Sequence, residues 1–160
     1  MPAPIRHAET KSDAAQARAL FEEYAAWLNV DLCFQGFAQE LATLPGAYAP
    51  PRGRLLLAGP PDAAVGCIAL RPLAGEAFSV PTGEIKRLYV KPEARGTGLG
   101  VRLVEMLLQE ARAIGYRELK LDTLERMTSA CRLYERLGFA ACSPYYHNPL
   151  PGVVYMTRTL

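Results

Sequence analysis

Residues 84–100 read EIKRLYVKPEARGTGLG and contain two kinds of local structure in succession. The first part, Glu84–Val90, is rich in β-favouring residues, and Pro92 must end the strand because proline cannot donate a hydrogen bond to a neighbouring strand. The second part, Arg95–Gly100, is rich in glycine and leads into apolar residues that recur at helical spacing as far as Gly115. These residues therefore predict a buried strand, a tight turn and an amphipathic helix.

The predicted turn has the properties of an anion-binding site. Glycine adopts backbone angles that are closed to other residues, and it places no Cβ between an anion and the amide N–H groups. Those groups lie at the positive end of the dipole of the following helix, beside the guanidinium of Arg95. Since glycines also mark ordinary tight turns, the turn alone does not establish a ligand. The residues expected to hold the anion are Arg95, Gly96, Thr97, Gly98, Leu99 and Gly100.

Two motifs, in the same order along the chain, resemble those of a known family. The pattern Arg-x-x-Gly-x-Gly at 95–100, after a strand and before a helix, resembles the pyrophosphate-binding motif of the GNAT superfamily of acyl-CoA-dependent N-acetyltransferases. The run LYERLGF at 133–139 resembles the second signature of that superfamily. The resemblance covers Glu84 to Phe139. It implies an acyltransferase that moves an acetyl group from acetyl-CoA to a primary amine of a small molecule or peptide, by direct attack in a ternary complex.

Composition and charge limit the classes of protein that need to be considered. The chain has 160 residues, of which 50% are hydrophobic, and this suits a single domain spanning residues 1–160. A net charge of +2 with dispersed Lys and Arg gives no basic stripe, so neither a nucleic-acid nor a membrane partner is expected. The opening sequence MPAPIRHAETKSD has no apolar signal segment, and no apolar run reaches the ~18 residues of a membrane span. These features predict a cytoplasmic protein.

The cysteines do not suggest a metal site. They are scattered along the chain without the paired spacing of metal ligands, and in a cytoplasmic protein they are expected to be reduced packing residues. No metal cofactor is therefore expected. The residues concerned are Cys33, Cys67, Cys131 and Cys142.

The order of the elements predicts an α/β (α+β) fold. Arg54–Ala58 and Val65–Leu70 are strand-like runs separated by a Gly-Pro-Pro-Asp turn, so they form an antiparallel hairpin. Glu118–Thr123 follows the helix as the next strand, and a strand–helix–strand crossover makes it parallel to the strand that begins at Glu84. The prediction is a mixed, mostly antiparallel central sheet with a parallel central strand pair, flanked by helices. In the resembled family this pair splays apart and opens a slot for the pantetheine arm.

Shorter elements complete the predicted fold. Ser12 or Asp13 is expected to cap a first helix that runs to about Leu28. Dimers are common in the resembled family, and a C-terminal strand that ends at the last residue could pair with another chain, so a homodimer is a candidate assembly. Other predicted elements are a strand at 5–8, a short helix around 37–44, a helix at about 127–137, and closing strands at 139–142 and 153–159.

Acetyl transfer from a thioester to an amine needs a neutral amine, a polarised carbonyl and a proton for the departing thiolate. Glu84, at the start of its strand, is the candidate base, because some members of the resembled family place their catalytic glutamate there. Other members use a water held by the backbone. The alternative without a function is that Glu84 is a solvated residue at the end of a strand. A backbone N–H among Leu88, Tyr89 and Val90 is expected to polarise the carbonyl. Tyr134 occupies the family's general-acid position, and its alternative role is packing along its helix.

One position departs from the family pattern. Many members carry an asparagine that binds pantetheine seven residues before the tyrosine, where this sequence has Met127. A thioether is at most a weak acceptor and no donor. Either Ser129 or the backbone replaces that contact, or apolar surface holds most of the arm.

The acceptor site is the least defined part of the prediction. Tyr24 and Trp27 lie one helical turn apart, and Tyr145 and Tyr146 lie in a proline-flanked loop, so all four are candidates for contact with the acceptor. Packing is the alternative for each of them, and it is favoured for His147, which has no partner at a useful spacing. Amino acids, polyamines, amino-sugar antibiotics, and protein N-termini or lysines all remain open as acceptors.

Two other functions share part of the pattern. A dinucleotide-binding domain would also have a strand, glycines, a helix and an acidic residue after the second strand, here Asp122. However, five residues separate the first strand from Gly96, and the glycine spacing is not Gly-x-Gly-x-x-Gly. A non-catalytic acyl-CoA sensor is the second alternative, and Tyr134 argues against it.

Overall fold

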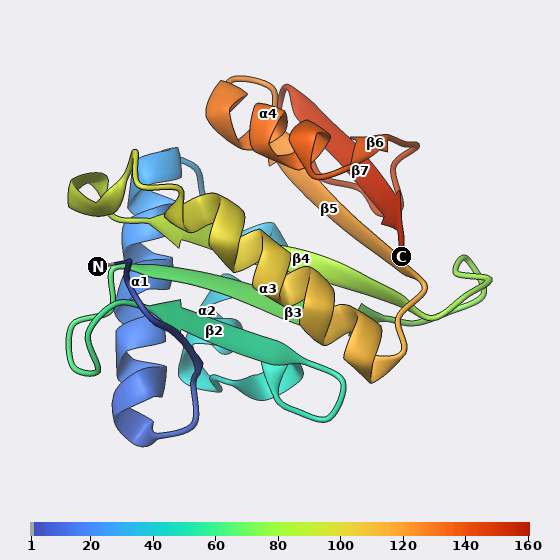
Figure 1. The fold of residues 1–160 in the computed structure, drawn as a ribbon. Helices are drawn as coiled ribbons and strands as arrows, with labels where there is room; N and C mark the ends of the chain where they lie inside the picture. Colours follow the sequence, from blue (N-terminus) through green and yellow to red (C-terminus); the bar gives the residue numbers. More distant parts are fainter. Residues whose placement is uncertain (1) are drawn as a thin grey trace.

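The computed structural model describes residues 2–160, and Figure 1 shows one twisted sheet with helices on both of its faces. The strands are β1 (Ile5–His7), β2 (Arg54–Ala58), β3 (Gly66–Leu73), β4 (Thr82–Val90), β5 (Glu118–Leu124), β6 (Ala140–Ala141) and β7 (Val153–Thr159). The α-helices are α1 (Lys11–Leu28), α2 (Phe37–Ala42), α3 (Leu99–Ile114) and α4 (Thr128–Arg136). Short 3-10 helices are η1 (Cys33–Gln35), η2 (Gly46–Tyr48) and η3 (Pro92–Ala94).

The strand order is β1-β2-β3-β4-β5-β7-β6. Every neighbouring pair is antiparallel except β4 and β5, which are joined through α3 and run parallel. The predicted mixed sheet with one parallel central pair is therefore confirmed, as is the hairpin of β2 and β3. This topology differs from the parallel sheet that a dinucleotide-binding domain requires.

The parallel pair separates soon after it begins. β4 and β5 pair only from Thr82 opposite Glu118 to Glu84 opposite Lys120, and Figure 1 shows the two strands diverging beyond that point. The chain thus has the splayed strand pair that the family resemblance implied. Backbone and side chains on both strands are left free to line a cavity between them.

The side chains of β2 point alternately into two layers of the hydrophobic core. Leu56 and Ala58 belong to the cluster that contains Leu103 of α3, whereas Leu55 and Leu57 belong to the cluster that contains Phe21 of α1. Successive side chains of a strand point to opposite faces, so a continuous apolar run such as β2 must be covered on both sides. The two helix layers fix the sheet from both faces and hold β4 in place.

The first helix begins earlier than predicted. Its N-cap is Thr10, not Ser12 or Asp13, because Thr10 and Asp13 form a capping box. Thr10 Oγ1 accepts a hydrogen bond from the Asp13 N–H at 3.0 Å, and the Asp13 carboxylate accepts one from the Thr10 N–H at 3.2 Å. Reciprocal satisfaction of these backbone and side-chain groups favours the Thr10 boundary.

Two further boundaries differ from the prediction and have functional consequences. β4 begins at Thr82, which is itself buried, so Glu84 lies inside the strand and not at its exposed start. β7 pairs with β5 on one side and with β6 on the other, so it is not an edge strand. The edges of the sheet are β1 and β6, so β7 is not the strand that would pair with a second copy, while the homodimer itself stays a prediction.

Candidate active site

A β-bulge interrupts β4 near the point where β4 leaves β5. Tyr89 lies opposite Cys67 and Lys86 lies opposite Ala69, so β4 has one more residue than β3 in this interval. The extra length is taken up at Arg87, whose φ of 62° is in the left-handed region. A bulge leaves backbone groups outside the ladder of strand hydrogen bonds. This irregular segment adjoins Leu88–Val90, the segment predicted to polarise a carbonyl.

Arg87 is fixed in this conformation by contacts with α2. Its Nε and Nη2 donate to the two carboxylate oxygens of Glu40, each at 2.9 Å, and its guanidinium lies 5.1 Å from the centre of the Phe37 ring. A two-point contact between guanidinium and carboxylate restrains both distance and orientation. The strained backbone of the bulge is therefore held by a buried ion pair from outside the sheet.

The glycine-rich turn lies beside the bulge and opens α3. Gly98 is the N-cap of α3 and, like Gly96, has a φ of 79°. Among residues 2–160, a Cβ added at either glycine would meet no atom within 4 Å apart from those of its chain neighbours, so the space in front of both is open. In the part of the chain that the structure describes, no side chain caps the N-terminus of α3. Its first N–H groups are therefore not used by a cap, and binding of an anion there stays a prediction.

A groove of about 330 Å³ runs along this turn, and we call it the glycine groove. It contains every residue predicted to bind the cofactor except Thr97, whose hydroxyl donates to the carbonyl of Ala94 at 2.8 Å. Residues from the turn, from β4 and from α4 thus form one continuous surface. The lining residues are Trp27, Leu88, Tyr89, Val90, Ala94, Arg95, Gly96, Gly98, Leu99, Gly100, Val101, Ser129, Ala130 and Leu133.

Arg95 folds back over the turn. Its Nε donates to the carbonyl of Val90 at 2.8 Å, and its guanidinium lies 4.7 Å from the centre of the Trp27 ring and 5.6 Å from that of Tyr89. The charge therefore sits beside the groove with one of its donors already used. The remaining donors can still reach an anion held by the turn.

A second cavity, which we call the slot cavity, lies where β4 and β5 diverge. Trp27, Leu88 and Ala130 line both this cavity and the glycine groove, so the two spaces adjoin. Tyr24 and Trp27 of α1 form part of its wall, and their contact with an acceptor stays a prediction. The lining residues are Tyr24, Trp27, Leu28, Leu32, Gln35, Ile85, Lys86, Arg87, Leu88, Asp122, Thr123, Leu124, Met127, Ala130, Tyr134, Asn148 and Leu150.

Tyr134 lies in the wall of the slot cavity near the groove. Its side chain is buried and packs edge-on against Phe139, with the ring centres 5.7 Å apart. Burial raises the pKa of Tyr134 above its ordinary value, so the phenol keeps its proton at neutral pH. The residue thus combines the packing role of an aromatic on α4 with the position and protonation state that a proton donor needs.

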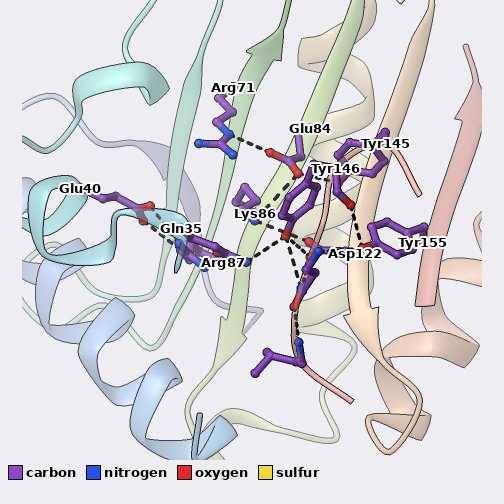
Figure 2. A network of polar contacts seen from close by, with 12 residues as sticks. Gln35, Glu40, Arg71, Glu84, Lys86, Arg87, Asp122, Tyr145, Tyr146 and Tyr155 are labelled. Carbon is purple, nitrogen blue, oxygen red and sulfur yellow. Dashed lines mark hydrogen bonds and ion pairs between the residues drawn. The ribbon is translucent and has the colours of Figure 1, made fainter. Parts of the chain in front are cut away.

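Glu84 is placed differently from the prediction. It is fully buried, so the alternative of a solvated strand-end residue is wrong. Its carboxylate accepts hydrogen bonds from Arg71 Nε at 2.7 Å and from the hydroxyl of Tyr145 at 2.5 Å (Figure 2). Neither Glu84 nor Tyr145 lines the slot cavity, so a proton from an acceptor could reach this carboxylate only through a water.

Asp122 is the carboxylate that lines the slot cavity, and its part in the site was missed from the sequence. It accepts hydrogen bonds from Asn148 Nδ2 at 2.7 Å and from the hydroxyl of Tyr146, and it lies 3.5 Å from Lys86 Nζ (Figure 2). Burial opposes its charge, but Lys86 and these hydrogen bonds outweigh burial and lower the pKa of Asp122. The signal that could have found it is its place towards the carboxyl end of a parallel strand.

The loop between β6 and β7 approaches the site through different residues from those predicted. Tyr145 and Tyr146 lie behind the wall of the slot cavity, where their hydroxyls bind Glu84 and Asp122. Both rings pack edge-on against Tyr155, at 5.6 and 6.0 Å between centres. These two tyrosines therefore brace the carboxylates, while other residues of the loop, Asn148 and Leu150, line the cavity.

Residues at the start of α4 line both the slot cavity and the glycine groove. Met127, the residue that stands in place of the family's asparagine, lines the slot cavity, whereas Ser129 lines the glycine groove. Ser129 and apolar neighbours thus occupy the surface where the pantetheine contact was predicted. Both alternatives for replacing the asparagine remain compatible with this arrangement.

The described residues give no sign of a metal centre or a membrane span. Within residues 2–160, His, Cys, Asp and Glu form no group of three or more that could hold a metal ion. In the same part of the chain, no helix is both long enough and apolar enough to cross a bilayer.

Comparison with known proteins agrees with this geometry. The profile of the Acetyltransferase (GNAT) family matches residues 14–139. An uncharacterized N-acetyltransferase of Schizosaccharomyces pombe is 43% identical over 145 residues, which cover 90% of this chain and 86% of that protein.

Two solved structures show the same fold. An acetyltransferase from Streptococcus agalactiae has a TM-score of 0.79 at 23% identity, over 100% of this chain and 99% of that one. A phosphinothricin acetyltransferase from Sinorhizobium meliloti, solved in complex with AcCoA, has a TM-score of 0.72 at 22% identity, over 100% and 89% of the two chains. With the family profile and the yeast relative, these matches establish that the chain belongs to the GNAT family of acetyltransferases.

Proposed function

We propose that this protein transfers an acetyl group from acetyl-CoA to a primary amine, by direct attack of the amine in a ternary complex. The observation that carries the proposal is the junction of two spaces at the bulge of β4. One space has the open N–H groups of a glycine turn, and the other contains Tyr134 and charged side chains. A thioester at the junction would face donors from the first space and an amine in the second.

The glycine groove supplies contacts for the donor molecule. Backbone N–H groups at Gly96, Gly98 and Gly100 would hold the pyrophosphate, with Arg95 beside them. The edge of β4 from Leu88 to Val90 would pair with the amides of the pantetheine arm, since this edge is free of β5. These contacts would bring the thioester carbonyl to the bulge.

The bulge offers the electrostatic contribution to catalysis. A backbone N–H near Leu88 that is not used in the sheet can donate to the carbonyl oxygen as it gains negative charge. Because the bulge is braced by the ion pair of Arg87 with Glu40, this donor would be held in place before the reaction. Removing one such donor from an enzyme typically costs about 10²–10³ in rate.

Proton transfers complete the reaction. The amine nitrogen forms a bond to the carbonyl carbon, the carbon–sulfur bond breaks, and Tyr134 donates its proton to the departing thiolate. Starting from the ammonium, the nitrogen must lose two protons. Glu84 would receive the first before the attack, through a water and either directly or by way of Tyr145, and the second would pass from the nitrogen to the Tyr134 phenolate and restore it. Asp122, kept charged by its partners, would stabilise the ammonium before deprotonation.

Two measurements test the proposal together. Acetyl-CoA should raise the melting temperature of the protein while NAD does not, and a panel of primary amines should then release free thiol and give an acetylated product by mass spectrometry. Binding without transfer to any amine would favour an acyl-CoA sensor. Stabilisation by NAD alone would remove the proposal.

A further inference from the structure

The slot cavity has an apolar end and a polar end. Near Tyr134 the wall is formed by apolar side chains such as Met127 and Ala130. Lys86, Asp122 and Gln35 form the polar end, since Lys86 Nζ lies 3.5 Å from Asp122 and both Gln35 and Asp122 bind the hydroxyl of Tyr146. The polar end is therefore the part of the cavity that can bind a polar group of the acceptor other than the reacting amine.

Lys86 is a buried cation whose partners are not close. Its side chain is 3% exposed, and Nζ lies 3.5 Å from Asp122 Oδ1 and 3.9 Å from Glu84 Oε2. Both distances exceed the ~2.7–2.9 Å of a charge-assisted hydrogen bond. Burial lowers the pKa of Lys86 despite these two carboxylates, so they do not offset its desolvation.

The two carboxylates are held by other groups. Glu84 is bound by Arg71 and Tyr145, and Asp122 is bound by Tyr146 and Asn148. Neither is free to move closer to Lys86 without breaking a shorter contact. The ammonium of Lys86 would therefore be stabilised most by an oxygen that enters from the cavity.

Gln35 adds an unfilled acceptor at the same end. Its Nε2 donates to the hydroxyl of Tyr146 at 3.1 Å, whereas its Oε1 is buried and has no hydrogen-bond partner within residues 2–160. A buried acceptor without a donor costs free energy unless a ligand or a water fills it. The polar end thus presents a cation for an acceptor's oxygen and an oxygen for an acceptor's N–H or O–H.

The charges around this end cancel before any substrate arrives. Three cations, Arg71, Lys86 and Arg87, accompany three carboxylates, Glu40, Glu84 and Asp122. Adding net positive charge to such a buried neutral cluster is costly, because the added cation loses its hydration and the nearby carboxylates already have partners. A substrate that carries one ammonium and one carboxylate adds no net charge. A polyamine or an amino-sugar with several ammonium groups would add several.

We infer that the acceptor is a small amino acid, whose carboxylate binds Lys86 while its amine faces the thioester. This inference rests on the proposed acetyl transfer and specifies its substrate class. The cavity volume of about 90 Å³ suits a small molecule, and Leu28, Leu32 and Leu124 in its wall suit an apolar side chain. Lys86 is thus a specificity-determining residue and not a participant in the chemical step.

A first experiment needs only the unaltered protein. The rate of thiol release is measured with leucine and with leucinamide, which keeps the amine and the side chain but replaces the carboxylate by a neutral amide. The amine of leucinamide is less basic, so a larger share of it is neutral and chemistry alone favours it. We expect leucine to have the higher kcat/KM by about tenfold or more, the effect of one charge-assisted contact. Equal or better use of leucinamide would overturn the inference.

A second experiment changes Lys86. Lys86→Met should raise the KM for leucine by about 10- to 100-fold and leave the KM for leucinamide and both kcat values within about twofold. Lys86→Arg should restore part of the preference for leucine. The matched control is Lys120→Met, which removes a lysine of the neighbouring strand that binds Glu118 at 3.0 Å and does not line the cavity. An equal loss for both substrates in the folded Lys86→Met variant would mean a structural role and would contradict the inference.

The outcomes separate this inference from the proposed function. If acetyl-CoA binds and amines without a carboxylate are acetylated as well as amino acids, acetyl transfer stands and the amino-acid specificity fails. If no amine or amino acid releases thiol, the proposed acetyl transfer is contradicted, and the amino-acid specificity that rests on it is contradicted with it. If Lys86→Met does not fold, the comparison of leucine with leucinamide on the unaltered protein decides the question.

Discussion

The guanidinium of Arg95 lies 4.7 Å from the centre of the Trp27 ring, and this contact connects the glycine groove with the slot cavity. Trp27 is the only tryptophan in the sequence, and it is 44% exposed. A cation above an indole ring is attracted by the electron-rich face, and a phosphate would compete for the same cation. The fluorescence of Trp27 should therefore report the binding of the donor molecule.

The first prediction is a change in Trp27 emission when acetyl-CoA is added, since the pyrophosphate would draw Arg95 from the ring. Arg95→Ala should remove most of the change and weaken binding by about 1.5–3 kcal/mol, the worth of one contact to a charged group, because the backbone N–H groups remain. A fluorescence titration gives both values. Unchanged emission at a concentration that raises the melting temperature would contradict this use of Arg95.

The second prediction concerns Gly98 at the N-cap of α3. Gly98→Val should abolish the binding of acetyl-CoA in a calorimetric titration, because the side chain would occupy the open space in front of the N–H groups. Folding should survive with a loss of about 1–3 kcal/mol from the left-handed backbone.

Gly115→Val is the matched control for Gly98→Val. Gly115 is the C-cap of the same helix, has a φ of 109°, and also has no protein atom within 4 Å of an added Cβ. The backbone strain is therefore similar in kind, but the anion site is untouched. Near-normal affinity in the folded Gly98→Val protein would rule out the glycine turn as the pyrophosphate site.

The third prediction is that Tyr134→Phe slows the chemical step by about 10²–10⁴-fold, the usual worth of general acid catalysis. The ring still packs against Phe139, so stability and the affinity for acetyl-CoA should be kept. Single-turnover measurement is needed because product release can limit steady-state turnover. Tyr116→Phe removes another buried hydroxyl, one that binds the carbonyl of Arg52, and should leave the rate unchanged.

The fourth prediction is the pH dependence that Tyr134 imposes. Burial raises the pKa of this phenol, so the group is protonated, and able to donate, at every pH below its raised pKa. The single-turnover rate should therefore show no descending limb below about pH 10, the ordinary pKa of tyrosine. A decrease that begins near pH 8 to 9 and is absent in Tyr134→Phe would show that the phenol titrates earlier than its burial allows.

The fifth prediction concerns Glu84 and the hydroxyl of Tyr145, which are 2.5 Å apart. If the amine's proton reaches Glu84 through this contact, Glu84→Gln and Tyr145→Phe should both lower turnover most at acidic to neutral pH and least at high pH, where neutral amine is abundant. The measurement is kcat/KM as a function of pH for both variants. A loss of equal size at every pH would show that the buried carboxylate is structural.

Much of the fold followed from patterns that act over a few residues. The strand before Pro92, the turn at 95–100 and the helix that ends at Gly115 are all present, because proline, glycine and helical periodicity constrain the backbone locally. The turn proposed as the anion site could be located for the same reason. The groups expected to bind there are backbone N–H groups, and their direction is set by the turn itself.

The surroundings of Glu84 could not be predicted in this way. Its partner Arg71 lies on β3, and Tyr145 lies 61 residues further along the chain in the loop before β7. Sequence spacing suggested a strand-end carboxylate, but β4 begins two residues earlier and buries it. Burial depends on which elements pack over a position, and the local sequence of β4 does not indicate which elements those are.

The polar end of the slot cavity is the clearest product of tertiary structure. Gln35 comes from η1, Lys86 from β4 and Asp122 from β5, and the three meet because β4 and β5 diverge after Glu84 and leave a space between them. The proposed recognition of the donor depends on backbone geometry within one turn, and the order of residues is enough to locate that turn. Acceptor recognition depends on desolvated side chains from distant elements, whose charges acquire their partners only when the sheet has formed.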